Sequence, residues 1–227
     1  MDKWKEIWNK EDRVYNYILE TLIKTDGFDK GAGSFSLNDW KEYTNEHFIK
    51  LDIRNNYTFY DIGCGSGAFV YPLYLKNHSV GGIDYSSVLI ELANTVMKDS
   101  SFEHKDALMI DTNLKYDIVF SHSVFHYFKN LDYAKKVIKK MILKSNKKIA
   151  IFDINDKSKE LEYHKVRIGK MKEQEYKKKY EGLEHLFYEK KWFENIAKEF
   201  GLKVNIFDQT YEKYSNSSLR FNVIMEK

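Results

Sequence analysis

The sequence has one cysteine, one proline and no long apolar run among its 227 residues. Because Cys64 is alone, the chain cannot form a disulfide within itself, and it has no cluster of thiolates to hold zinc. A membrane-spanning helix needs roughly 20 apolar residues in a row, and no segment approaches that length. The first residues also lack the apolar stretch and small-residue cleavage site of a signal peptide. We therefore expect a cytoplasmic protein with no membrane segment.

Arginine is also scarce, and neither sign of charge dominates. The chain has 37 basic and 34 acidic residues, and only four of the basic residues are arginine. Proteins that grip phosphate backbones favour the bidentate fork of arginine, and they concentrate positive charge on one face. We therefore expect no nucleic-acid partner. Hydrophobic residues make up 43% of the chain, which is enough for a substantial core.

The central part of the chain alternates between expected strands and helices. The strands are expected at 57–62, 79–84, 101–104, 116–121 and 147–153, with helices at about 67–76, 86–98 and 131–144 between them. Such alternation favours a parallel sheet with right-handed crossovers. Pro72 falls inside the first of these helices, where a proline beyond the first turn costs roughly 3 kcal/mol. The helix is therefore expected to start later or to kink.

The two ends of the chain follow other patterns. Residues 1–56 carry amphipathic spacings and are expected to form a helical lid or extension. One of its helices should begin near Asn38 or Asp39, either of which could cap it. The second unit is expected to span 57–227 and to contain a polar insert at 156–188, either a lid over a substrate or a solvated helical segment. A helix at 189–200 and strands at 202–208 and 219–226 follow. These two strands have no helix between them, so they are expected to pair antiparallel if they are neighbours.

A glycine-rich turn follows the first central strand, in the segment Asp61-Ile62-Gly63-Cys64-Gly65-Ser66-Gly67. Alternating glycines let the backbone turn tightly and approach a ligand without Cβ clashes. Gly63, Gly65 and Ala68 also satisfy the dinucleotide fingerprint G-x-G-x-x-A, so a nicotinamide-dependent oxidoreductase is an alternative. Asp61 argues against it, because a carboxylate at this place suits a cationic ligand and repels a pyrophosphate.

Four segments in order carry a family resemblance. YDIGCGSG resembles motif I of the class I S-adenosylmethionine-dependent methyltransferases, and GGIDYS resembles their second acidic motif. HKDAL at 104–108 and KYDIVFSHSVFHYF at 115–128 are similar to the third and fourth motifs. The resemblance implies a Rossmann-like, doubly wound α/β fold. Its seven-stranded sheet would be mostly parallel, with one antiparallel C-terminal strand. S-adenosylmethionine would be the cofactor and S-adenosylhomocysteine the product.

The resemblance also implies roles for ten residues. Asp61 would meet the methionine ammonium group, and Gly63, Gly65 and Gly67 would lie under the cofactor. Asp84 would hold the ribose diol, with Tyr85 against the adenine. Asp106 and Ala107 would lie at the adenine amino group, and Ser121 and His122 at the sulfonium. Taken singly, Asp84 and Asp106 could equally be strand-end or helix-cap carboxylates.

The acceptor is expected beyond the fourth and fifth strands, because ligands of parallel sheets lie at the carboxyl ends of strands. His126 follows the fourth strand and Asp153 is expected to end the fifth, so a histidine oriented by a carboxylate is a candidate general base. A buried histidine that touches no substrate is the alternative. Four residues are expected to bind the acceptor: Tyr127, His185, Tyr188 and Arg220.

No metal is expected, since His122 and His126 lack both the glutamate of H-E-x-x-H and a third ligand. The N/D-P-P-Y/F signature of many DNA methyltransferases is absent. We therefore expect a small polar acceptor, such as a sugar or another precursor of a cell-surface glycan, with methylation on oxygen favoured over nitrogen. The composition favours a bacterial source, and the protein is expected to be a monomer or a homodimer. A non-catalytic cofactor-binding protein is a further alternative.

Overall fold

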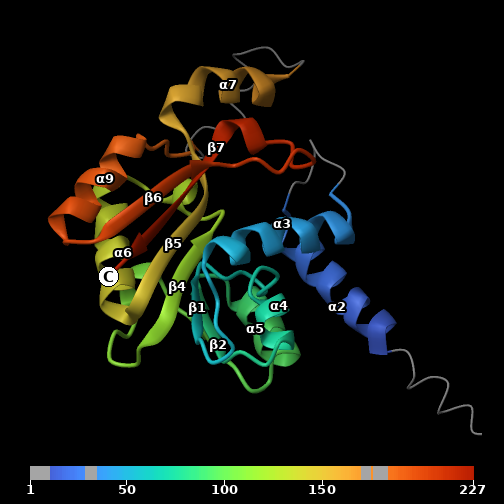
Figure 1. Cartoon of the computed structure of the whole chain (residues 1–227). Helices are drawn as coiled ribbons and strands as arrows, with labels where there is room; N and C mark the ends of the chain where they lie inside the picture. The colour runs from blue at the N-terminus through green and yellow to red at the C-terminus, as the bar shows by residue number, and fades with distance from the viewer. Residues whose placement is uncertain (1–10, 29–34, 170–174, 176–183) are drawn as a thin grey trace, which may run out of the picture.

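A seven-stranded sheet forms the centre of the protein, in a computed structural model that describes residues 11–28, 35–169, 175 and 184–227 (Figure 1). The strand order is β3-β2-β1-β4-β5-β7-β6. The strands are β1 (Phe59–Ile62), β2 (Val80–Asp84), β3 (Ser101–His104), β4 (Tyr116–His122), β5 (Ser145–Asn155), β6 (Lys203–Asp208) and β7 (Arg220–Glu226). The first five strands are parallel, and β7 runs antiparallel to both β5 and β6. This arrangement confirms the expected fold class.

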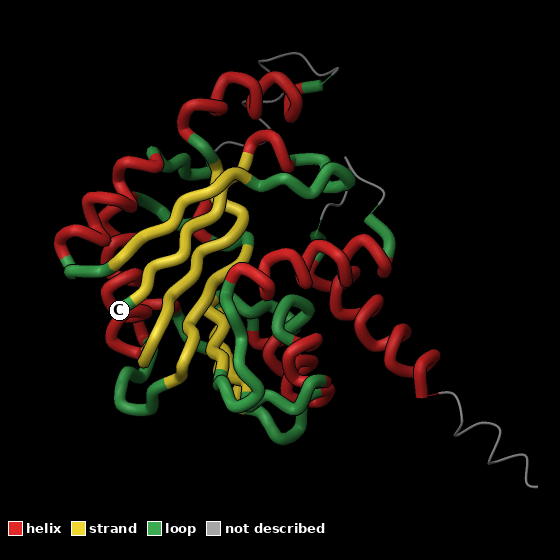
Figure 2. Tube along the Cα trace, in the orientation of Figure 1, coloured by secondary structure: helices red, strands yellow, loops and turns green. Residues whose placement is uncertain are grey.

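Helices cover both faces of the sheet, as Figure 2 shows. They are α2 (Glu11–Asp26), α3 (Leu37–Lys50), α4 (Tyr71–Leu75), α5 (Ser87–Val96), α6 (Leu131–Lys144), α7 (Glu160–Ile168) and α9 (Lys190–Glu199). One buried apolar cluster joins the sheet to α2, α3, α4 and α5, and a second joins it to α6 and α9. Strands that are apolar on both sides are therefore buried from both directions, as a doubly wound sheet requires. None of the helices in the described ranges is both long and apolar enough to cross a membrane.

Helix α3 begins one residue earlier than the sequence predicts, and its cap is different. Ser36 is the N-cap, and its side chain accepts from the backbone N–H of Asp39. Asp39 in turn accepts from the Ser36 backbone N–H at 2.9 Å, which completes a capping box. The prediction of Asn38 or Asp39 as the cap was wrong, because Asp39 is the third helical residue that closes the box.

Pro72 is accommodated by a late helix start. Helix α4 begins at Tyr71, so the proline occupies the first turn, where its missing N–H would have no partner within the helix. The glycine-rich turn ends at Gly67, before this helix begins. Of the two expectations for Pro72, the later start is confirmed.

Strand β5 is longer than predicted and contains an irregularity. It continues to Asn155, and its pairing with β7 shifts register between Ile151 and Ile154. Asp153 lies in this bulge with φ of 61°, and its backbone N–H donates to the Asn222 side chain. The expectation that Asp153 ends the strand was wrong, because a bulge turns its side chain without ending the pairing.

The described part of the insert after β5 packs against the rest of the protein. A short 3-10 helix, η3 (Lys157–Lys159), leads into α7, and Tyr163 packs with Phe187 and Leu219 in a small apolar cluster. Figure 1 shows α7 beyond the edge of the sheet at which β7 begins. Residues 170–174 and 176–183 of the predicted insert lie outside the described residues.

Candidate active site

A cavity of about 1050 Å³ runs along the edge of the sheet where the parallel strands end. Since β7 is antiparallel, its first residue, Arg220, lies at this same edge. Twelve of the predicted site residues line the cavity: Asp61, Gly63, Gly65, Asp84, Tyr85, Asp106, Ala107, His122, His126, Tyr127, His185 and Arg220. Gly67, Ser121, Asp153 and Tyr188 are not among the lining residues.

The glycine loop, residues 63–67, requires glycine for two separate reasons. Gly63 and Gly65 have φ of 74° and 55°, a region that side chains disfavour. A Cβ on Gly65 would also lie 2.6 Å from Oδ1 of Asp26. The loop therefore presents bare backbone to the cavity at Gly63 and Gly65. Gly67 instead faces the Met97 side chain, so it supports packing below the loop.

Asp61 is the penultimate residue of β1, beside the glycine loop, and it is 1% exposed. Its Oδ1 is buried and makes no hydrogen bond. Burial, followed by the charges of Asp26 and Asp84, raises the pKa of Asp61 well above its usual value. A buried acceptor without a donor is rare, and it suits a site that receives a cation.

Asp84 ends β2, and its carboxylate organises the loop beside it. Oδ2 accepts from the Gly65 backbone N–H at 2.9 Å, and Oδ1 accepts from that of Ser86 at 2.8 Å. The carboxylate has further acceptor positions, because each oxygen carries two lone pairs. Tyr85 follows with 82% of its surface exposed.

Asp106 follows β3 at the same end of the cavity. Its Oδ1 caps the 3-10 helix η1 (Ala107–Met109) through the Leu108 N–H and accepts from the Tyr133 hydroxyl at 2.7 Å. Asp106 therefore has a capping role, which was the alternative considered for it. Both contacts use Oδ1, so the carboxylate of this cavity-lining residue keeps acceptor capacity at Oδ2.

Asp26 at the end of α2 is a lining residue that sequence reasoning missed. Its carboxylate accepts from the Ser66 N–H at 2.7 Å and from the Ala68 N–H at 3.4 Å. Asp26 is exposed at the cavity, yet desolvation of its carboxylate by the surrounding protein raises the pKa to about 6. Nothing local in the sequence signals this role, because Asp26 and Ser66 are 40 residues apart.

His122 and Ser121 end β4 and are held by the protein itself. The His122 ring stacks on Phe69 at 4.1 Å and shares a hydrogen bond of 2.8 Å with the Tyr43 hydroxyl. Burial lowers the pKa of His122 to about 3, so the ring is neutral. The Ser121 hydroxyl donates to the Ile62 carbonyl, within the sheet.

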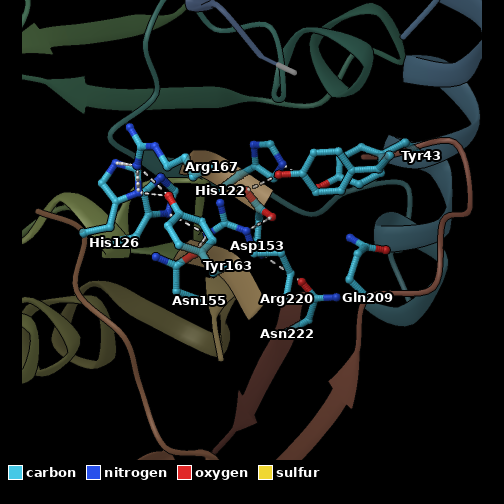
Figure 3. Close-up of polar contacts among 12 residues, drawn as sticks. Tyr43, His122, His126, Asp153, Asn155, Tyr163, Arg167, Gln209, Arg220 and Asn222 are labelled. Carbon is cyan, nitrogen blue, oxygen red and sulfur yellow. Dashed lines mark hydrogen bonds and ion pairs between the residues drawn. The ribbon is translucent and has the colours of Figure 1, made fainter. Parts of the chain in front are cut away.

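His126 lies in the 3-10 helix η2 (Phe125–Tyr127) and is 2% exposed. Arg220 lies beside it: Nη1 is 3.4 Å from His126 Nδ1, and Nε is 3.4 Å from Asp153 Oδ1 (Figure 3). No hydrogen bond joins the Asp153 carboxylate to the His126 ring, although both side chains are described. Asp153 instead accepts from the Tyr214 hydroxyl at 3.1 Å. Burial, and next the Arg220 charge, lowers the pKa of His126 well below its usual value.

The other predicted acceptor-binding residues have different surroundings. Tyr127 is 67% exposed and lines the cavity, and His185 lies 4.9 Å from His126 between ring centroids. Tyr188 is fully buried, and its hydroxyl donates to the Phe125 carbonyl. That contact fixes η2 beneath the cavity. Tyr163 and Arg167 of α7, together with Tyr214 and Asn216 before β7, complete this end of the lining.

Comparisons with known proteins agree with this geometry. A family model described as a methyltransferase domain matches residues 53–201. The 235L protein of Invertebrate iridescent virus 6, whose name assigns it provisionally to the methyltransferases, is 32% identical over 112 residues. That match covers 43% of this chain and 42% of the viral protein, so it spans less than half of the relative's length.

Solved structures share the fold at low sequence identity. An S-adenosylmethionine-dependent methyltransferase of Clostridium acetobutylicum has a TM-score of 0.61 at 14% identity, covering 97% of this chain and 98% of that chain. The magnesium protoporphyrin IX methyltransferase of Synechocystis, solved with bound S-adenosylhomocysteine, has a TM-score of 0.60 at 14% identity, with coverage of 95% and 98%. The family match spans more than half of the sequence, and the solved structures share the fold. The chain therefore belongs to this methyltransferase domain family, with the fold of class I S-adenosylmethionine-dependent methyltransferases.

Proposed function

We propose that this protein transfers the methyl group of S-adenosylmethionine to a small polar acceptor bound in the cavity along the sheet edge. The observation that carries the proposal is the buried, unpaired Oδ1 of Asp61 next to the bare backbone of the glycine loop. A buried carboxylate in this state is stabilised by a cation, and the methionine end of the cofactor carries an ammonium group.

The residues around Asp61 fit the rest of the cofactor. Gly63 and Gly65 leave room for close approach, and the Asp84 carboxylate is positioned by two backbone donors with acceptor capacity left for ribose hydroxyls. Tyr85, Asp106 and Ala107 lie where the adenine would extend, beyond β2 and β3. Gly67 and Ser121 act in this proposal only through packing below the site.

Bound cofactor supplies a methyl group on sulfonium sulfur, and an acceptor atom takes it by in-line displacement. The protein's part is to orient the two partners and to exclude water. Four of the lining residues form an aromatic wall that would exclude water from the reacting atoms: Phe28, Trp40, Phe69 and His122. His126 is neutral and lines the acceptor side, so it is the side chain best placed to accept a proton from an acceptor hydroxyl.

Methylation on oxygen and a sugar or glycan-precursor acceptor both stay predictions. A neutral histidine base supports the first, because a hydroxyl must lose a proton whereas an uncharged amine can attack directly. The cavity of about 1050 Å³ would have to hold both the cofactor and the acceptor, which supports a small acceptor. A screen of small metabolites for methyl transfer, with the product identified by mass spectrometry, would establish the atom methylated.

Cofactor choice is tested by calorimetric titration of the protein with S-adenosylhomocysteine and, separately, with NADH. We expect binding of the first ligand and none of the second. Asp84→Ala should weaken binding by roughly 10- to 150-fold, since a hydrogen bond to a charged group contributes about 1.5–3 kcal/mol. The exposed Asp99 provides the matched control, because Asp99→Ala removes a carboxylate outside the cavity. Tighter binding of NADH than of S-adenosylhomocysteine would overturn the proposal.

A further inference from the structure

We infer that the acceptor carries an oxyanion, a carboxylate or a phosphate, which Arg167 and Arg220 bind at the arginine end of the cavity. We use "arginine end" for the lining formed by His126, Tyr127, Tyr163, Arg167, His185 and Arg220. The inference rests on the proposed function and adds the chemical class of the acceptor to it.

The two guanidinium groups converge from different parts of the chain. Arg167 comes from α7 and Arg220 from the start of β7, yet the Cζ atom of each lies 5.7 Å from the centre of the Tyr163 ring. Both residues also line the same cavity. An anion bound between them would interact favourably with two positive charges.

Arg220 is held by the protein through only part of its guanidinium group. The residue is 5% exposed, and its Nη1 donates to Asn155 Oδ1 and to His126 Nδ1. Its Nε makes no hydrogen bond, and Oδ1 of Asp153, 3.4 Å away, makes none either. A well-formed arginine–carboxylate pair is bidentate and shorter, so Asp153 positions the guanidinium without saturating its donors.

The two histidines of the arginine end, His126 and His185, are neutral. Arg167 Nη1 donates to the Tyr163 hydroxyl at 2.6 Å and lies 3.0 Å from His185 Nδ1. Burial, followed by the charges of Arg167 and Arg220, lowers the pKa of His185 to about 4. Neither His126 nor His185 is therefore protonated at neutral pH, and the positive charge belongs to the guanidinium groups.

The carboxylates of the cavity lie elsewhere. The acidic lining residues in the described part of the chain lie next to the glycine loop or near the ends of β1, β2 and β3. They are Asp26, Asp61, Asp84 and Asp106. No carboxylate of the described residues lines the arginine end. Lys105 and Lys129 also line the cavity, near Asp106 and Tyr133. The cavity nevertheless offers its acids where a cationic cofactor would bind and its arginines where the acceptor would bind. This division favours an anionic partner at the second place.

Direct binding tests the inference. The protein saturated with S-adenosylhomocysteine is titrated with benzoate, with phenyl phosphate and with benzamide, which matches benzoate in shape but is uncharged. We expect benzoate or phenyl phosphate to bind at least about tenfold more tightly than benzamide, and the stronger of the two identifies the oxyanion. Equal affinity for benzamide, or no binding of either anion, would overturn the inference.

Variants separate this site from general charge effects. Arg167→Gln should weaken binding of the preferred anion by about tenfold while leaving the affinity for S-adenosylhomocysteine unchanged. Arg54→Gln removes an exposed arginine outside the cavity and should change neither affinity. Arg220 is buried, so a large change there could unfold the protein. The second variant is therefore the conservative Arg220→Lys, and thermal unfolding shows whether it is folded. Unchanged anion binding in a folded Arg167→Gln protein contradicts the inference, whereas loss of S-adenosylhomocysteine binding by the parent protein contradicts the proposed function instead.

A second test uses natural acceptors. Small molecules extracted from the source cells are divided by anion exchange, and each fraction is supplied with the protein and radiolabelled S-adenosylmethionine. We expect the methyl acceptor in the retained, anionic fraction, and its loss after phosphatase treatment would identify a phosphate. Acceptor activity confined to the unretained fraction would count against an oxyanion.

Discussion

Asp26 is the residue whose ionisation most directly affects the glycine loop. Its pKa is raised from 3.8 to about 6, so the folded protein binds a proton there more tightly than the unfolded chain does. Stability from this group is therefore present below about pH 3.8 and is lost as the pH rises towards 6. The full shift corresponds to ~3 kcal/mol, and solvent in the open cavity reduces the effect.

Asp26→Asn should remove this pH dependence, because asparagine keeps an oxygen acceptor for the Ser66 N–H but does not ionise. We expect the variant to gain stability relative to the parent protein between pH 4 and pH 7, measured as the difference in free energy of unfolding in denaturant. The gain should be smaller when S-adenosylhomocysteine is bound, since its ammonium group would favour the ionised carboxylate. A stability difference independent of pH would show that Asp26 titrates normally.

The proposed role of His126 as a general base can be tested directly by kinetics. If it is the base for a hydroxyl acceptor, His126→Ala should lower kcat by roughly 10²–10⁴-fold with little change in cofactor affinity. The low pKa of His126 also predicts a pH–rate profile without a limb near 6.5, because the ring is already neutral there. His126→Asn distinguishes proton abstraction, which is lost, from hydrogen bonding, which is kept. An alanine variant within a few-fold of the parent would indicate an acceptor that is already ionised.

At the scale of elements, the glycine loop is in contact with both β2 and α2. Gly65 donates to Asp84, and its Cα faces the Asp26 side chain of α2. Gly65→Val should therefore abolish binding of S-adenosylhomocysteine, both through its positive φ and through contact with Asp26. The measurement is titration, with circular dichroism to show that the variant is folded. Gly201→Val is a useful control, because Gly201 also has positive φ but faces open space away from the cavity. Normal binding by the Gly65 variant would mean that the loop does not contact the cofactor.

Helix α7 is the element expected to respond to the acceptor. It contributes Tyr163 and Arg167 to the cavity but packs on the main body through the small cluster of Tyr163, Phe187 and Leu219. Few buried contacts imply a low local free energy of opening. Hydrogen exchange should show added protection over 160–168 when S-adenosylhomocysteine and an acceptor are both bound, with α9, which contributes no residue to the cavity lining, as the unchanged reference. Equal protection in the free and bound states would favour a static appendage.

At the scale of the whole molecule, sequence reasoning succeeded where information is local. The glycine loop with Asp61 occupies seven consecutive residues, and the alternation of strands and helices is visible along the chain, so the fold class and the cofactor followed from them. Asp84 was placed in the cavity for the same reason, because strand ends in a parallel sheet share one edge. Gly67 shows the limit of a motif, since its glycine serves packing against Met97.

The parts that could not be predicted depend on contacts distant in sequence or on backbone irregularity. Asp26 reaches the loop from 40 residues away, and Arg220 comes between Asp153 and His126 from a strand that pairs with β5. No periodicity indicates that β5 bulges at Asp153. The predicted carboxylate–histidine arrangement was therefore replaced by an arginine that contacts both side chains.

The position of β7 has a consequence for the order in which the protein acquires its parts. Strand β7 lies between β5 and β6, although both precede it in the chain, and β7 is the pairing partner that joins β6 to the sheet. Docking of β6 must therefore wait for a pairing that spans more than 60 residues, and such long-range closure is slow. Strand β1 pairs with β2 between residues only 21 apart, such as Phe59 and Val80, so the glycine loop between them is expected to form early. Refolding monitored by stopped-flow methods should thus regain S-adenosylhomocysteine binding before it regains binding of an acceptor, because Arg220 is the first residue of the last strand to enter.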